Sequence, residues 1–97
     1  MIKDRVGRQR YILFSVQGDA SRRDVIRAIN EAYRSIDADG DAPWLTVYTG
    51  SYGIVRCSHT KKEETIRLLN GISNDFSLST VQTSGTIKTL KQQIAAQ

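Results

Sequence analysis

Residues 16 to 23, VQGDASRR, place a glycine, a serine and two arginines directly after an apolar run. Free backbone N–H groups at a helix start can bind an anion, and a nearby arginine adds a matching charge. Ser21 and Asp24 have the spacing of a capping box, which explains them without a ligand. Arg22 and Arg23 oppose the helix dipole there, so an anion in contact with them is favoured. The anion could be a small phosphate substrate or a larger polyanion.

The run Val16-Gln17-Gly18, followed by Arg22, resembles the active-site loop of the acylphosphatases, small ferredoxin-like hydrolases. The acylphosphatases share an asparagine on a neighbouring strand. The predicted strands at residues 44–49 and 52–57 of this chain contain no asparagine. Asp19 would also place a carboxylate beside the phosphate. Hydrolysis of acyl phosphates is therefore the least favoured alternative.

Other catalytic and metal chemistry is not predicted. His59 has no cysteine or carboxylate at ligand spacing, and Cys57 alternates with other strand positions as a small core residue would. A single cysteine excludes a disulfide framework and favours a reducing, cytoplasmic compartment. We expect a non-catalytic chain that binds no cofactor or metal itself.

The hydrophobic pattern predicts an α+β domain of order β-α-β-β-α-β with an added C-terminal helix. Strands are expected over residues 10–17, 44–49, 52–58 and 76–83. Helices are expected over residues 22–36, from a capping box at Thr60 and Glu63 to Asn70, and after Gly85. This order is typical of the ferredoxin-like (RRM-like) fold, an antiparallel sheet with both long helices on one face. Residues 1–9 are expected to form a flexible basic arm, and residues 10–97 a single domain.

Charge in the 97-residue chain is unevenly distributed. Lysine and arginine number 14 against 10 aspartates and glutamates, and four of the basic residues fall in the first ten positions. Separated signs of this kind favour a basic face that follows a polyanion such as RNA. No apolar run reaches the roughly 20 residues that span a bilayer, so no membrane partner is expected.

The sheet face away from the long helices is the face on which an RNA-recognition motif stacks bases. Tyr52-Gly53-Ile54-Val55 faintly resembles the core of such a strand, but Leu13 and Ile54 are poor stacking platforms. We expect the C-terminal helix, or a protein partner, to cover this face. A generic module for single-stranded RNA is the first alternative function.

Four segments together resemble ribonuclease P protein component 2, the ferredoxin-like subunit of archaeal ribonuclease P, related to a eukaryotic nuclear subunit. They are residues 8–12 (RQRYI), 42–45 (APWL), 53–57 (GIVRC) and 83–88 (TSGTIK) with Lys91. The resemblance implies support of a catalytic RNA that removes the 5′ leader from precursor tRNA, with Mg²⁺ on that RNA. It also implies pairing with the barrel-shaped component 3, as well as a homodimer or a heterotetramer. The lead-in at residues 4–7 departs from the family, which puts contacts made there in doubt.

Basic and hydroxyl-bearing positions make up the expected RNA contacts. They are Arg5, Arg8, Arg10, Arg22, Arg23, Arg56, Lys61, Lys62, Ser84, Gly85, Thr86, Lys88 and Lys91. Hydroxyls and a glycine suit close contact with phosphate oxygens, although Ser84-Gly85-Thr86 also fits a plain helix cap. Expected protein contacts are Trp44, Leu45, Leu13 and Ile54, with Trp44 also compatible with the core.

Overall fold

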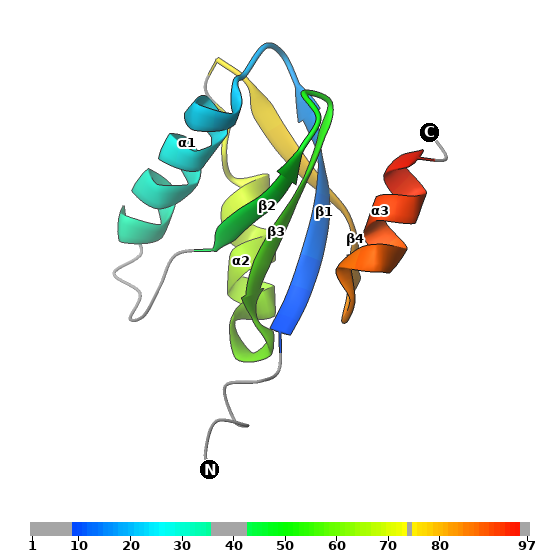
Figure 1. Cartoon of the computed structure of the whole chain (residues 1–97). Helices are drawn as coiled ribbons and strands as arrows, with labels where there is room; N and C mark the ends of the chain where they lie inside the picture. The colour runs from blue at the N-terminus through cyan, green and yellow to red at the C-terminus, as the bar shows by residue number, and fades with distance from the viewer. Residues whose placement is uncertain (1–8, 36–42, 74, 96–97) are drawn as a thin grey trace.

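A computed structural model describes residues 9–35, 43–73 and 75–95 of the chain. The elements are β1 (Gln9–Gln17), α1 (Arg22–Ser35), β2 (Trp44–Tyr48), β3 (Tyr52–Ser58), the 3-10 helix η2 (His59–Lys61), α2 (Lys62–Asn70), β4 (Ser77–Ser84) and α3 (Ile87–Ala95). The strands form one sheet in the order β2-β3-β1-β4, with every neighbouring pair antiparallel. This arrangement confirms the predicted ferredoxin-like fold (Figure 1). The expected arm at residues 1–9 lies outside the described residues except for Gln9, which opens β1.

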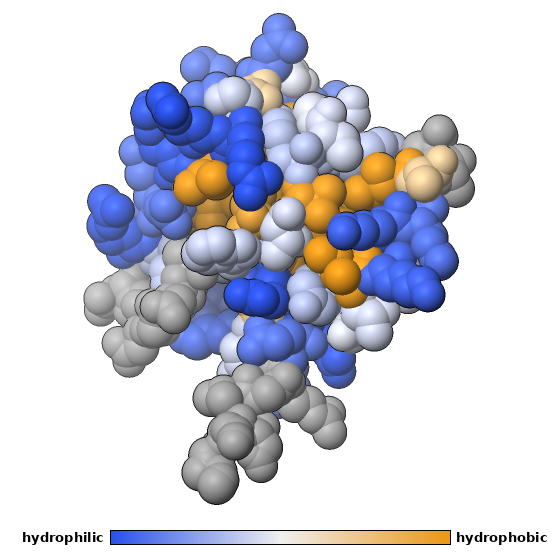
Figure 2. Space-filling model, in the orientation of Figure 1, coloured by the Kyte–Doolittle hydropathy of each residue, from blue (hydrophilic) through white to orange (hydrophobic). Residues whose placement is uncertain are grey.

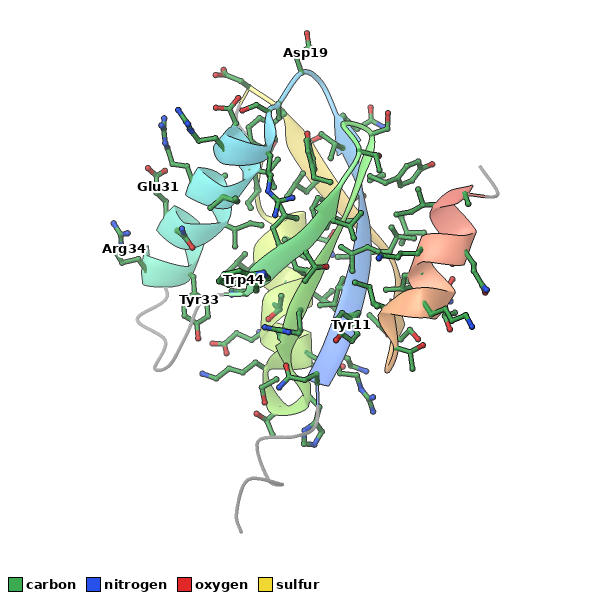
Figure 3. All side chains as sticks on the ribbon, in the orientation of Figure 1. Tyr11, Asp19, Glu31, Tyr33, Arg34 and Trp44 are labelled. Atoms are coloured by element: carbon green, nitrogen blue, oxygen red, sulfur yellow. The ribbon has the colours of Figure 1, made fainter. Side chains whose placement is uncertain are left out.

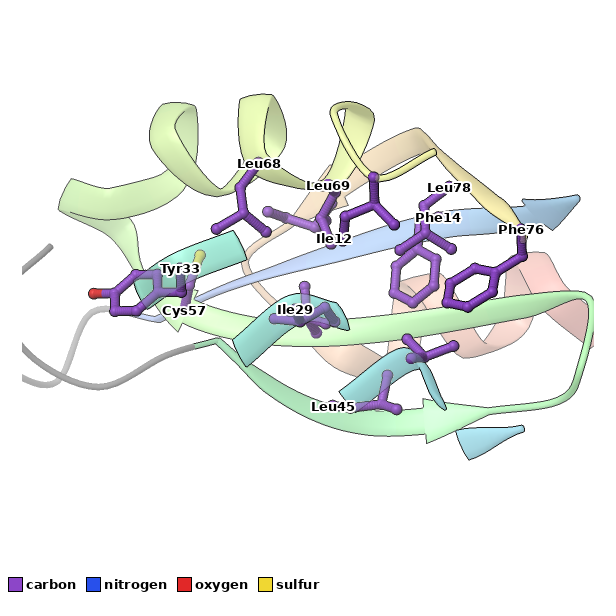
Figure 4. Packing of buried hydrophobic residues seen from close by; sticks show 13 residues of the cluster. Ile12, Phe14, Ile29, Tyr33, Leu45, Cys57, Leu68, Leu69, Phe76 and Leu78 are labelled. Atoms are coloured by element: carbon purple, nitrogen blue, oxygen red, sulfur yellow. The ribbon is translucent and has the colours of Figure 1, made fainter. Parts of the chain in front are cut away.

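The main core lies between the sheet and the helices α1 and α2 (Figure 4). Ile12 and Phe14 of β1 and Val55 of β3 point into it and are completely buried, as the two-residue period of a strand predicts. A Cβ on Gly53 would lie 2.4 Å from Phe14 Cζ, so only glycine lets the far edge of the ring approach β3 this closely. The Phe14 ring thus fixes β1 and β3 under the helices.

A second, smaller cluster covers the middle of the opposite face of the sheet, where α3 packs (Figure 1). Leu90 of α3 is completely buried against Leu13 and Ile54, with Ile87 and Ile94 packed around them. The expectation that the C-terminal helix covers this face is therefore confirmed.

Of the two predicted capping boxes, the structure contains the one at α1 and lacks the one at α2. At α1, the Ser21 N–H donates to Asp24 Oδ2 at 3.1 Å and the Asp24 N–H donates to Ser21 Oγ at 3.2 Å, which is the predicted capping box. The box predicted at Thr60 and Glu63 is wrong. Thr60 lies within η2, its hydroxyl pairs with that of Ser58 at 3.1 Å, and α2 begins after Lys61 with no side-chain cap.

None of the helices over the described ranges has the length and apolar character needed to cross a membrane. Within the same ranges, no three His, Cys, Asp or Glu side chains group in a way that could hold a metal ion.

Candidate nucleic-acid interface

Charged residues are distributed differently over two parts of the molecule, which we call the sheet layer and the helix layer. The sheet layer comprises β1, β2, β3, β4 and α3, and among its described residues there is no Asp or Glu. It carries Arg10, Arg56, Lys88 and Lys91. The helix layer comprises α1 and α2 with the loops beside them, and it holds every described carboxylate: Asp19, Asp24, Glu31, Glu63, Glu64 and Asp75. The sheet layer is therefore the surface that a polyanion meets without repulsion.

Hydrophilic side chains lie on the surface of both layers (Figure 2). In the view of Figure 2, hydrophilic side chains cover the outer surfaces of α1 and α3, and an apolar band runs between them. Lys88 and Lys91 are exposed on α3, while Arg56 is exposed on β3. These cations are free to approach phosphate groups in solution.

The turn between β4 and α3 lies against Arg10, which is half-buried on β1. A Cβ on Gly85 would lie 2.9 Å from Arg10 Nη1, so the backbone of the turn and the guanidinium are close together. The Ser84 hydroxyl accepts a hydrogen bond from the Thr86 N–H at 3.2 Å, and Thr86 Oγ1 pairs with Thr89 Oγ1 at 3.0 Å. The structure thus brings four of the predicted RNA contacts into one corner at the start of α3. The Ser84 hydroxyl thus bonds to the residue just before α3, and the Thr86 hydroxyl bonds to a side chain in the first turn of α3.

The stretch VQGDASRR is occupied largely by contacts within the chain. Gly18 has φ of +104°, and a Cβ there would lie 3.1 Å from the Asp75 carbonyl oxygen, so its glycine serves a tight turn. Arg22 Nη2 donates to the Leu45 carbonyl oxygen at 3.0 Å, which links α1 to β2. The pKa of Asp24 is lowered, first by the Ser21 N–H and hydroxyl and then by Arg27 and Arg23. An ionised carboxylate therefore lies close to Arg27 and Arg23, and it weakens the positive potential around these two arginines.

Two lysines of the expected footprint also have partners inside the chain. Lys61 Nζ lies 6.0 Å from the centroid of the Tyr33 ring, within the range of a cation–π contact. Lys62 Nζ lies 3.9 Å from Glu63 Oε2. Both cations belong to the helix layer and not to the corner at Gly85. Arg5 and Arg8 lie outside the described residues.

Three of the four residues expected at a protein interface are interior residues of this chain. Leu45 is 5% exposed in the main core, and Leu13 and Ile54 are 1% and 0% exposed beneath α3. They were misassigned because sequence alone does not show which helix covers them. Trp44 differs, since 64% of its surface is exposed, so it is not a core residue.

Nothing in this geometry favours nucleophilic catalysis by Cys57. Its side chain is buried, and burial raises the pKa of the thiol against smaller opposing effects of Thr65 and Lys62. A buried thiol with a raised pKa is a poor nucleophile.

The fold and the charged surface define a class: a small ferredoxin-like α+β domain with one acid-free layer. A chain in the cryo-EM structure of yeast ribonuclease MRP has a similar fold, with a TM-score of 0.68 over 92% of this chain and 92% of that chain. The two share 14% sequence identity, so the likeness establishes the fold. No protein-family model and no curated protein sequence matches the chain.

Proposed function

We propose that this chain is an RNA-binding protein subunit of a ribonucleoprotein that processes RNA, of the ribonuclease P and MRP kind. The observation that carries the proposal is the acid-free sheet layer with Arg10, Arg56, Lys88 and Lys91. A likeness over nearly the whole length to a chain of ribonuclease MRP supports it, as do the four segments that resemble ribonuclease P protein component 2.

In the finer form of the proposal, the complex is ribonuclease P, and its RNA removes the 5′ leader from precursor tRNA. The chain would bind that RNA and pair with protein component 3, while Mg²⁺ would act on the RNA. The protein's own contribution is electrostatic. Cations of the sheet layer neutralise phosphates and release their counterions, so compact RNA needs less Mg²⁺.

Contacts are proposed in two ranks. The corner of Arg10, Ser84, Gly85 and Thr86 places a guanidinium beside a helix start with two hydroxyls, which suits a phosphate oxygen. Arg56, Lys88 and Lys91 belong to the same layer of the molecule. A smaller share falls to Arg22, Arg23, Lys61 and Lys62, because carboxylates or internal partners lie beside them.

Reconstitution tests the proposal. Ribonuclease P RNA and component 3 are incubated with precursor tRNA at limiting Mg²⁺, with and without this chain. We expect the chain to restore removal of the 5′ leader and to lower the Mg²⁺ requirement. The double variant Arg56→Glu/Lys88→Glu should fold but fail to restore cleavage, since both side chains are exposed. Unchanged rate and Mg²⁺ requirement on adding the wild-type chain would contradict the proposal.

A further inference from the structure

One row of side chains crosses all four strands at the end of the sheet where β1 and β2 begin. Trp44 of β2 is in register with Arg56 of β3, Arg56 with Tyr11 of β1, and Tyr11 with Ser84 of β4. The neighbours Leu45, Val55 and Ile12 lie in the main core, so alternation places the row on the opposite face, the one that carries α3. Figure 3 shows Trp44 at the start of β2 and Tyr11 on β1.

Cover by α3 reaches only part of this row, where Tyr11 packs against the cluster of Leu13, Ile54 and Leu90. The next row toward the middle of the sheet, Ile54 and Leu13, is sealed by Leu90 and has no exposed surface of note. In the open row, Trp44 is 64% exposed and Arg56 is exposed, while Tyr11 and Ser84 are half-buried. The row therefore presents an indole ring, a guanidinium and a phenol side by side.

We infer that this open row binds an unpaired RNA base, which stacks on Trp44 while the Arg56 guanidinium stacks beside it or pairs with its phosphate. The inference rests on the proposed RNA-binding function and names the part of the RNA that this surface takes. Aromatic and arginine side chains on a sheet are the groups on which unpaired bases stack. Duplex RNA offers no free base face to such a platform.

Charge and size favour RNA over a protein as the occupant. The strands and α3 carry no carboxylate that would pair with a basic protein surface or repel a phosphate. The row spans three strand spacings, about 14 Å. Such a single row is much smaller than the roughly 800 Å² that each partner buries in a standard protein interface.

Intrinsic fluorescence gives a direct test, because Trp44 is the chain's only tryptophan. A short single-stranded oligoadenylate and a blunt duplex RNA of the same length are titrated into the full chain. We expect the single strand to quench the tryptophan emission to saturation and the duplex to leave it nearly unchanged. Trp44→Ala should weaken binding of the single strand about tenfold, and Trp44→Phe should retain most of the affinity.

Ile26→Ala is the matched control, since Ile26 is another exposed large apolar side chain but lies on α1. It should leave affinity for the single strand unchanged. If both RNAs bind but neither quenches, and Trp44→Ala binds like wild type, base stacking is excluded while the RNA-binding function stands. If neither RNA binds the folded chain, the proposed function fails together with the inference.

Discussion

The two layers of this molecule differ in what holds them together and in the charge they carry. The helix layer packs against a core of thirteen buried residues, while α3 rests on a cluster with only three. Acidic and basic residues are mixed along α1 and α2, whereas every charged residue of the strands and α3 is basic. The side of the sheet with the small core, which carries α3 and Arg56, is thus the one fitted for a polyanion.

The difference assigns separate roles to the two layers. Most of the burial that stabilises the fold lies under α1 and α2, which therefore tolerate mixed charge on their outer surface. The face of the sheet under α3 contains less burial, and the sheet layer concentrates one sign of charge. Binding and stability should consequently respond to different substitutions.

The largest expected effect comes from Leu90→Ala. Leu90 is completely buried and is the only α3 residue in the three-residue cluster with Leu13 and Ile54, so its loss should cost about 3 kcal/mol. Because that cluster is small, we expect amide hydrogen exchange to rise first in α3. Leu69→Ala, which removes a completely buried side chain from the main core, should lower global stability without this preference for α3. Equal protection of α3 in both variants would show that the layers unfold as one.

A smaller effect distinguishes two adjacent arginines on α1. Arg22 donates to the Leu45 carbonyl oxygen, and its replacement by alanine should lower the free energy of unfolding by about 1 kcal/mol. Arg23→Ala serves as the control and should leave stability nearly unchanged. Urea denaturation measures both. If Arg22→Ala instead leaves stability unchanged and weakens RNA binding strongly, the main role of Arg22 is RNA binding and not the link between α1 and β2.

The smallest effect concerns the cap of α1. Ser21→Ala removes the hydroxyl that accepts from the Asp24 N–H and should cost about 0.5 kcal/mol at neutral pH. The pKa of Asp24 is held below its ordinary value of 3.8 in the folded state, first by the Ser21 N–H. Its carboxylate therefore stabilises the fold above about pH 4, and the contribution is lost as the pH falls through the lowered value.

Stability measured from neutral to acid pH checks this cap. The gap between wild type and Ser21→Ala should narrow below pH 4, because protonated Asp24 no longer takes part in the capping box. A gap that widens toward acid pH would show that Asp24 is not held ionised by this cap.

Local patterns sufficed for the fold and for the cover of the second sheet face. Alternation in β1 placed Ile12 and Phe14 under the helices, and the stripe of Ile87, Leu90 and Ile94 indicated the cover over the other face. The strand register was not accessible, since nothing local states that Trp44, Arg56 and Tyr11 share a row. The partner of Arg22 is likewise a backbone carbonyl 23 residues away, which no sequence pattern shows.

One signal was present in the sequence and was missed. The strand segments and the C-terminal helix contain no carboxylate, whereas the helices between them do. Charge grouped by element, instead of by position along the chain, would have separated Arg56 and Lys88 from Arg22 and Lys62 before any coordinates. Thr60 and Glu63 failed as a cap because a 3-10 turn precedes α2.

The salt dependence of RNA binding tests the central claim, that the sheet layer is the RNA surface. Affinity for ribonuclease P RNA is measured over a range of salt concentrations for three proteins. They are the wild type, Arg56→Glu/Lys88→Glu in the sheet layer, and Arg27→Glu/Arg34→Glu, a matched pair of exposed arginines on α1. We expect the first double variant to reduce the slope of log affinity against log salt by up to about two, and the second to leave it nearly unchanged. Equal reductions, or a larger one for the α1 pair, would contradict the central claim.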